Sequence, residues 1–176
     1  MSHILITGLP GVGKTTLIRK LAQRLTDYHP IGFYTEEIRV RGIRKGFQLV
    51  TLDGRQQILS HVDQHSPHRV GRYRVDVVGF ERLLAELNLG HPPSRVIVID
   101  EIGKMECLSR WFVEQMRTLL DSSRTVIATI ALKGMGFIQQ VKQRPDCRIV
   151  TVTVENRDSL AETLAREIGA AMRETQ

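Results

Sequence analysis

The sequence predicts one α/β domain whose mainly parallel, doubly wound sheet is covered by helices on both faces, and three observations indicate this fold class. Residues 3–7 form a short apolar run that leads directly into a glycine-rich loop and then into a segment with helical spacing. Residues 96–99 are four β-branched residues in succession, which is typical of a strand buried on both faces of a parallel sheet. Strand-like and helix-like segments alternate through most of the chain, which favours right-handed crossover connections.

The loop after the first predicted strand has the spacing of a phosphate-binding loop, G-x-x-x-x-G-K-[ST]. It stands between a predicted strand and a predicted helix, the context that this motif requires. Its glycines let backbone N–H groups converge on one anion, and the first turn of the helix adds further unpaired N–H groups. We therefore expect a nucleotide to bind at Gly8, Leu9, Pro10, Gly11, Val12, Gly13, Lys14, Thr15 and Thr16.

Two side chains of this loop have distinct expected roles. Lys14 should act in catalysis by reaching the β- and γ-phosphates, and the Thr15 hydroxyl should help to hold Mg²⁺. Thr16, one position further along, is expected on the surface of the helix.

The composition fits one globular domain, because 41% of the residues are hydrophobic and can build a core. No apolar run approaches the roughly twenty residues needed to cross a bilayer, and the amino terminus reads as a strand rather than a signal sequence. We therefore expect a cytoplasmic protein without a membrane partner. Cys107 and Cys147 have no C-x-x-C spacing, so the sequence indicates neither a disulfide framework nor a thiolate zinc site.

The chain is basic, with a formal net charge of +6 and a pI of about 9.7. This charge would suit either nucleic acid or a polyanionic nucleotide. Aromatic residues make up only 5% of the chain, so stacking platforms for single strands are few. Net charge alone does not choose between these ligands, and the sequence makes no prediction about oligomeric state.

Residues 31–76 are a basic, β-rich section within the α/β pattern. The alternating residues 31–38 predict a strand, residues 39–46 a turn or flap, and residues 47–52 a returning strand. Residues 57–60 and 72–76 predict further short strands. We interpret the section as a small β-rich insertion in a single domain.

Three histidines and an aspartate lie within residues 61–69, which suggests a metal site as one interpretation. Histidines in a polar loop are usually solvated, and no partner for their second ring nitrogen is predictable here. We therefore favour a solvated loop.

The remaining elements follow from hydrophobic spacing and from helix start and stop signals. We expect the first helix to end near residues 27–30, a second helix over 80–87 and a break at 91–94. After the buried run come a core-facing helix over 107–121, a strand over 125–130, a loop over 133–136, a helix over 137–142, a strand over 147–153 and a final helix capped by Asn156.

Two adjacent acids, Asp100 and Glu101, end the second buried run. The carboxyl ends of parallel strands are where such sheets bind ligands, which places both acids beside the phosphate loop. Because neighbours on a strand point to opposite sides, we expect Asp100 to hold the Mg²⁺ shell and Glu101 to act on a water molecule near the γ-phosphate. The alternative is that the two acids cap the following helix.

Several stretches together resemble one family, the small nucleoside-triphosphatases described from thermophiles, whose mammalian relative is called the cancer-related nucleoside-triphosphatase. The stretches that carry the resemblance span nearly the whole chain and are residues 8–16, 32–39, 46–52, 70–76, 99–106 and 153–157. Many families share the phosphate loop, whereas residues 33–39 and 100–106 together are far more specific.

The resemblance implies a three-layer P-loop NTPase with a RecA-like fold that hydrolyses several nucleoside triphosphates, and diphosphates less well. It also implies that the nucleotide is lined by residues 8–15 and by Ile97, Val98, Ile99, Asp100, Glu101, Ile102, Gly103 and Lys104. The family usually has a segment richer in proline and glycine where this chain has residues 131–136, so the resemblance assigns no role to Lys133.

No Asn-Lys-x-Asp segment occurs, so a strong preference for guanine is not expected. The candidates for a contact with the base or sugar are Asn156 and Arg157, which follow the last predicted strand. We therefore expect Mg²⁺-dependent hydrolysis of ATP, GTP, CTP and UTP with broad base specificity.

Two other functions stay open on the sequence alone. A small-molecule or nucleotide kinase would need an acceptor pocket and a lid, to which the basic flap of Arg39, Arg41, Arg44 and Lys45 could contribute. A nucleic-acid-binding ATPase, which is not favoured, would use this flap together with Arg69, Arg72 and Arg74.

Overall fold

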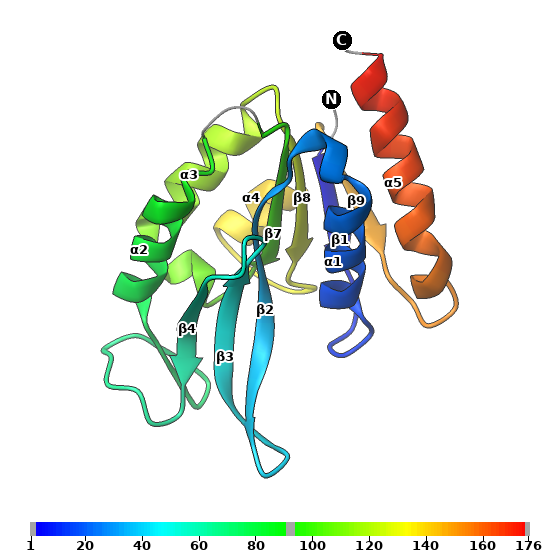
Figure 1. Cartoon of the computed structure of the whole chain (residues 1–176). Coiled ribbons are helices and arrows are strands. Elements are labelled where there is room, and N and C mark those ends of the chain that lie inside the picture. The colour runs from blue at the N-terminus through cyan, green and yellow to red at the C-terminus, as the bar shows by residue number, and fades with distance from the viewer. Residues whose placement is uncertain (1–2, 91–93, 175–176) are drawn as a thin grey trace.

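The computed structural model describes residues 3–90 and 94–174, and in this part of the chain one nine-stranded sheet runs through the molecule (Figure 1). The strand order is β5-β6-β4-β3-β2-β7-β8-β1-β9. The parallel half consists of β2 (Ile31–Val40), β7 (Val96–Ile102), β8 (Thr125–Ile130), β1 (His3–Thr7) and β9 (Cys147–Thr151). The carboxyl ends of these five strands meet at one edge of the sheet.

The antiparallel half extends the same sheet beyond β2. It consists of β3 (Ile43–Thr51), β4 (Gln56–His61), β6 (Tyr73–Val75) and β5 (Arg69–Val70). β2 belongs to both halves, because Ile31–Phe33 pair in parallel with β7 while Phe33–Val40 pair antiparallel to β3. The β-rich section is therefore the antiparallel half of one continuous sheet.

The turn or flap predicted for residues 39–46 is a tight turn rather than a flap, because β2 and β3 continue through this range to residues 41 and 42. Arg41 and Gly42 form this turn with φ angles of 49° and 78° between the paired residues Val40 and Ile43. Two positive φ angles in succession match the right-handed twist of the flanking strands. The hairpin projects beyond the rest of the molecule at the bottom of Figure 1.

Helices cover both faces of the sheet and make three layers. One face carries α1 (Lys14–Arg24), the short turn η1 (Thr26–Tyr28) and α5 (Arg157–Arg173). The other carries α2 (Val77–Leu87), α3 (Arg110–Leu120) and α4 (Phe137–Lys142). Within the described residues no helix has the length and apolar character that a membrane crossing requires.

Two predicted helix starts differ from the structure: α2 begins at Val77 rather than at residue 80, and α3 begins after residue 107. Residues Glu106–Leu108 form a separate turn, η2, and α3 begins only at Arg110, because Ser109 Oγ accepts a hydrogen bond from Phe112 N at 2.9 Å. Asn156 precedes α5 as predicted, but its side chain makes no capping hydrogen bond. Of the predicted break at residues 91–94, residues 91–93 lie outside the described residues.

Alternation along the central strands divides the core into two clusters. Ile97 and Ile99 of β7 pack in the cluster under α2 and α3, whereas Val96 and Val98 pack in the cluster under α1 and α5. Gly32 lets β2 approach β7 closely, since a Cβ atom there would lie 1.8 Å from Val98 O. This close approach brings the antiparallel half against the parallel half without a gap.

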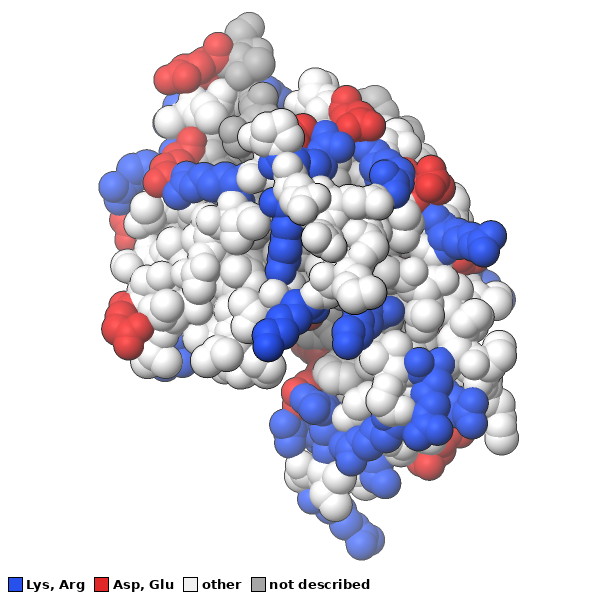
Figure 2. Space-filling model, turned by 180° about the vertical axis from the view of Figure 1, so that it is seen from behind, with Lys and Arg blue, Asp and Glu red and all other residues white. Residues whose placement is uncertain are grey.

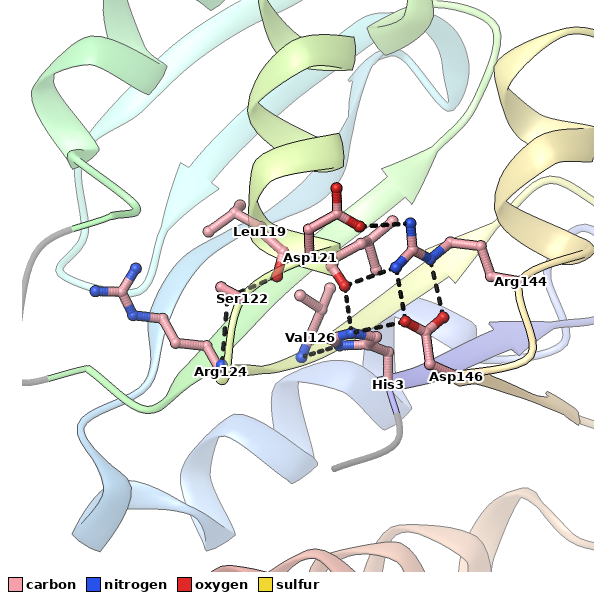
Figure 3. A network of polar contacts seen from close by, with 9 residues as sticks. His3, Leu119, Asp121, Ser122, Arg124, Val126, Arg144 and Asp146 are labelled. Carbon is pink, nitrogen blue, oxygen red and sulfur yellow. Dashed lines mark hydrogen bonds and ion pairs between the residues drawn. The ribbon is translucent and has the colours of Figure 1, made fainter.

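A buried polar network holds the amino ends of the parallel strands, opposite the phosphate loop (Figure 3). His3 is only 2% exposed; its Nε2 lies 3.0 Å from Leu120 O, and its Nδ1 accepts from Val126 N at 3.2 Å. Arg144 donates to Leu120 O at 2.8 Å and pairs with Asp146 at 2.6 Å. The accepting Nδ1 fixes the neutral imidazole with its proton on Nε2, so protonation of His3 would break the contact with β8.

Burial lowers the pKa of His3 from 6.5, although the hydrogen bond to Leu120 and the charge of Asp146 oppose this effect. The unfolded chain therefore binds a proton before the folded one does. We predict that the contribution of His3 to the free energy of unfolding is fully present above pH 6.5 and is lost as the pH falls below it. In His3→Gln, which cannot titrate, the decrease in the free energy of unfolding with falling pH should be smaller.

Urea unfolding at pH 7.5, 6.5 and 5.5 measures the effect, with the exposed His29→Gln as the matched control. An equal acid dependence in the wild type and in His3→Gln would show that His3 does not cause it.

Candidate active site

The phosphate loop has the geometry that its sequence predicts. Gly8, Gly11 and Gly13 have φ angles of 153°, 76° and 111°, and Gly13 occupies the position immediately before α1. Lys14 Nζ donates to Gly8 O at 3.1 Å and to Leu9 O at 3.2 Å, so its charge lies over the loop. The loop and the first turn of α1 thus present backbone N–H groups and one cation to the same space.

The carboxylate of Asp100 is the centre of the site. It is 3% exposed and accepts from Thr15 Oγ1 at 2.7 Å, from Thr35 N at 3.2 Å and from Thr129 Oγ1 at 2.6 Å. A further hydrogen bond joins Thr35 Oγ1 to the backbone oxygen of Asp100. The alternative that Asp100 caps the following helix is therefore wrong, since Ser109 caps α3 and Asp100 ties α1, β2 and β8 to β7.

Glu101 lines the same cavity as Asp100, although regular strand alternation predicts opposite sides. The pairing of β7 with β8 is interrupted between Ile99 and Ile102, where the two acids lie. Burial and the neighbouring charge of Asp100 raise the pKa of Glu101, while Lys14 and Lys142 lower it. A carboxylate with a raised pKa is a better proton acceptor than an exposed one.

One cavity of about 610 Å³ joins the phosphate loop to the antiparallel half of the sheet. Around the loop it is lined by Gly8, Pro10, Gly11, Gly13, Lys14, Thr15 and Thr16. Asp100, Glu101, Gly103 and Lys104 line it from β7 and the turn that follows. Ala131, Leu132 and Lys133 lie at the end of β8, and the remaining lining residues come from β2 to β5 and from residues 105 and 106.

Glu106 is a carboxyl group of this cavity that the sequence did not indicate. It is 5% exposed, and burial raises its pKa to about 8 while backbone hydrogen bonds from Glu106 and Gly103 oppose the rise. The charges of Glu101 and Asp100 add to the increase. A methyl group placed on Gly103 would meet Glu106 Oε2 at 2.8 Å and Glu101 Cδ at 3.4 Å, so the two carboxyl groups lie close to the same point.

Several residues of the predicted nucleotide site do not line this cavity. Ile97, Val98, Ile99 and Ile102 are 0% exposed, and their side chains pack in the core. Leu9 is exposed at the tip of the loop, and Val12 is buried under it. These residues support the site through the backbone or the core.

Asn156 and Arg157 lie beside the phosphate loop on the β9 side. Asn156 Oδ1 accepts from Thr153 N at 2.8 Å, and its Nδ2 donates to Thr151 O at 2.9 Å, which closes the turn before α5. A methyl group placed on Gly13 would lie 3.8 Å from Arg157 Cδ. The pair is therefore adjacent to the loop but outside the cavity.

The two threonines that hold Asp100 were missed as site residues because each lies on a different strand from it. Thr35 is on β2 and Thr129 is near the end of β8, and both strands flank β7 in the parallel half. The sequence offers one signal for Thr129, which is a polar residue near the carboxyl end of an otherwise apolar predicted strand. Ligand sites of parallel sheets lie at these strand ends.

The oxygen atoms of Thr15 and Asp100 form a donor set that suits Mg²⁺, which prefers a few hydroxyl and carboxylate ligands. Among residues 3–90 and 94–174, no cluster of three or more His, Cys, Asp or Glu side chains could hold a metal ion. In the histidine-rich loop, His61 Nδ1 lies 3.7 Å from Asp63 Oδ2.

Comparison with known proteins finds relatives that match this chain over most of its length. A family model described as NTPase matches residues 3–165. The nucleoside-triphosphatase THEP1 of Thermotoga maritima is 46% identical over 158 residues, which cover 89% of this chain and 90% of the relative. The human cancer-related nucleoside-triphosphatase is 42% identical over 175 residues, which cover 90% of this chain and 92% of the relative.

A solved structure has the same fold. The crystal structure of THEP1 from Aquifex aeolicus superposes with a TM-score of 0.83 at 37% identity and covers 92% of this chain and 96% of its own. This likeness confirms the predicted fold class, an α/β three-layer P-loop NTPase fold. The structure adds that the β-rich section, predicted as a small insertion, continues the central sheet as its antiparallel half.

The raised pKa of Glu106 makes a prediction about stability. The folded chain keeps the proton up to about pH 8, whereas the unfolded carboxyl loses it near pH 4.5. The stabilisation that the retained proton of Glu106 contributes is therefore full below pH 4.5, and it is lost as the pH rises to about 8. We expect Glu106→Gln, which resembles the protonated acid, to become more stable relative to the wild type as the pH rises.

Urea unfolding of both proteins at pH 5, 6.5, 8 and 9 tests this, with Glu114→Gln on the exposed side of α3 as the matched control. A stability difference that stays constant over this range would contradict a buried, protonated Glu106.

Proposed function

Because this chain belongs to the nucleoside-triphosphatase family, we propose that it hydrolyses ATP, GTP, CTP and UTP to the diphosphate and phosphate, and nucleoside diphosphates less efficiently. The observation that carries the proposal is the hydrogen bond of 2.7 Å between Thr15 Oγ1 and Asp100 Oδ2. It joins the phosphate loop to the acidic end of β7 in one cavity that Glu101 also lines. This combination suits the transfer of a phosphoryl group to water.

Mg²⁺ is the proposed cofactor, and Thr15 and Asp100 are the residues that would hold it. When bound, the ion neutralises charge on the phosphate oxygens. Thr129 Oγ1 and Thr35 N donate to the Asp100 carboxylate, which fixes its direction before a nucleotide arrives. The carboxylate therefore needs no reorganisation on binding.

The chain's own groups account for the remaining steps of hydrolysis. Backbone N–H groups of residues 8–15 hold the phosphates, and Lys14 balances the charge that develops on the γ-phosphoryl group. Glu101 orients the attacking water and accepts its proton, for which its raised pKa is favourable. Glu101 and Lys14 line the same cavity.

Broad base specificity follows from where the base would lie. Asn156 and Arg157 are the proposed neighbours of the base or sugar, beside the loop on the β9 side. The Asn156 amide accepts from Thr153 N and donates to Thr151 O, so one acceptor site and one donor of this side chain are committed to the turn before α5. Arg157 is exposed and provides a surface rather than a closed pocket.

Nucleic acid is a less favoured ligand, although basic residues gather on the projecting part of the molecule (Figure 2). Arg39 and Arg44 pair with Glu37 at 2.5 Å and 2.8 Å. Arg72 donates to Arg44 O at 2.5 Å, and Arg74 donates to Ser66 O at 3.0 Å. Much of the basic charge therefore serves to order the antiparallel half.

The first prediction of this proposal is that ATP, GTP, CTP and UTP are cleaved with kcat/KM values within about tenfold of one another, a spread of about 1.4 kcal/mol. Phosphate release with each nucleotide, in the presence and absence of RNA, measures this. Folded Lys14→Ala should release almost no phosphate, which ties the activity to the loop. A preference of several hundredfold for one base, or full activity in Lys14→Ala, would overturn the proposal.

The second prediction separates binding from chemistry at Glu101. Glu101→Gln keeps the size of the side chain but removes the proton acceptor, so the rate of single-turnover hydrolysis should fall by at least about 100-fold. The affinity for Mg·ATP should change little, because the proton moves only in the transition state. Calorimetry and rapid-quench measurements on the same preparation decide this. Weak binding with normal turnover at saturation would mean that Glu101 holds the nucleotide rather than the water.

A further inference from the structure

The cavity reaches much further than a triphosphate on the phosphate loop requires. The sheet order places β1 and β3 four strand spacings apart, or roughly 19 Å at about 4.8 Å per spacing. Figure 2 shows the molecule hollowed between its main body and the projecting part. We call the end of the cavity beyond Glu101 the far compartment, which is lined by Glu37, Arg44, Phe47, Leu59, Val70, Met105 and Glu106.

The base of the nucleotide has its proposed place on the other side of the loop. Arg157 lies against Gly13 from the direction of β9, and β9 and β3 are on opposite sides of β1 in the sheet. A nucleotide placed in this way directs its γ-phosphate toward Glu101. The far compartment then begins where the nucleotide ends.

One wall of the far compartment is an aromatic and cationic assembly that is held in place by its own contacts. Arg44 donates to Glu37 Oε1 at 2.8 Å and to the Tyr73 hydroxyl at 3.0 Å. Its guanidinium carbon lies 5.2 Å from the centre of the Phe47 ring, and Phe47 packs edge to face on Tyr73 at 5.3 Å. A side chain fixed in this way needs little ordering when a ligand binds.

The rest of the far compartment combines an apolar floor with one buried acid. Leu59, Val70 and Met105 provide the floor, and Glu106 is the buried polar side chain that lines the cavity beside them. Because burial raises the pKa of Glu106 to about 8, its carboxyl is protonated at neutral pH and can donate a hydrogen bond. An apolar pocket with a few convergent polar groups is typical of a small-molecule site.

We propose that the far compartment binds a second substrate, a small aromatic or heteroaromatic alcohol that accepts the γ-phosphoryl group. The ring packs against Phe47 and the apolar floor, and Glu106 donates to a ring nitrogen or oxygen. The hydroxyl points toward Glu101, which lies between the far compartment and the phosphate loop. The inference rests on the proposed function, because the phosphoryl donor is the nucleoside triphosphate on that loop.

The transfer balances without a further reactant. The alcohol oxygen forms a bond to the γ-phosphorus while the bond from the γ-phosphorus to the β–γ bridging oxygen breaks. The electron pair of that bond leaves on the nucleoside diphosphate, and the hydroxyl proton passes to Glu101. The products are a phosphate monoester and the diphosphate, and hydrolysis is the same reaction with water in place of the alcohol.

The test uses the full chain with ATP labelled in the γ-phosphate and four probes, namely benzyl alcohol, 3-pyridylmethanol, uridine and glycerol. Thin-layer chromatography separates labelled phosphate from a labelled phosphate monoester. We expect a monoester with at least one ring-bearing alcohol and a yield at least tenfold lower with glycerol. Phosphate release without a monoester from any ring-bearing probe, or a glycerol yield equal to theirs, overturns the inference and leaves the hydrolase function intact.

Variants of the wall then locate the acceptor. Phe47→Ala removes the ring contact and Val70→Phe narrows the compartment, so each should lower the ratio of monoester to free phosphate by at least tenfold. Ile58→Ala is the matched control, because Ile58 is the exposed neighbour of Leu59 and does not line the cavity. An unchanged ratio in both wall variants overturns the inference, and absence of all phosphate release from wild-type protein would instead contradict the proposed function.

Discussion

The hydrogen-bonded carboxylate of Asp100 is the constraint on which the rest of the site depends. Three threonines from α1, β2 and β8 donate to this one buried group on β7. A buried charge without such partners would be strongly destabilising, so the contacts that shape the site also make the charge tolerable. Because the contacts cross three elements, the phosphate loop, the acidic strand end and the antiparallel half hold fixed positions relative to one another.

The order and direction of the strands explain why one cavity has two kinds of lining, a phosphate-binding part and an apolar and aromatic part. The parallel half of the sheet brings the carboxyl ends of β1, β7 and β8 together. The phosphate loop with Lys14 follows β1, the two acids Asp100 and Glu101 lie near the end of β7, and residues 131–133 follow β8. At β2 the pairing changes to antiparallel, and the strands beyond it carry Arg44, Phe47, Leu59 and Val70 along the same edge. The change of direction therefore places an apolar and aromatic wall next to a phosphate site.

Local patterns predicted the features that depend on neighbouring residues. The phosphate loop and the acids at the end of β7 could be located because each needs only a strand end and a turn. Thr35 and Thr129 could not be assigned in this way, since their hydrogen bonds to Asp100 come from strand pairing across 65 and 29 residues of sequence. The burial of Glu106 could not be assigned either, because this residue begins the turn η2 and lies outside every element that the sequence predicts.

The most direct measurement of the central claim is calorimetric binding of a non-hydrolysable ATP analogue to wild type and Asp100→Asn, with Mg²⁺ and with EDTA. The carboxamide can keep hydrogen bonds to the threonines, so the fold should be retained while the charge is lost. The account predicts at least a tenfold loss of affinity with Mg²⁺ and little change with EDTA. An equal loss under both conditions would contradict it, because Asp100 would then serve only to hold the loop.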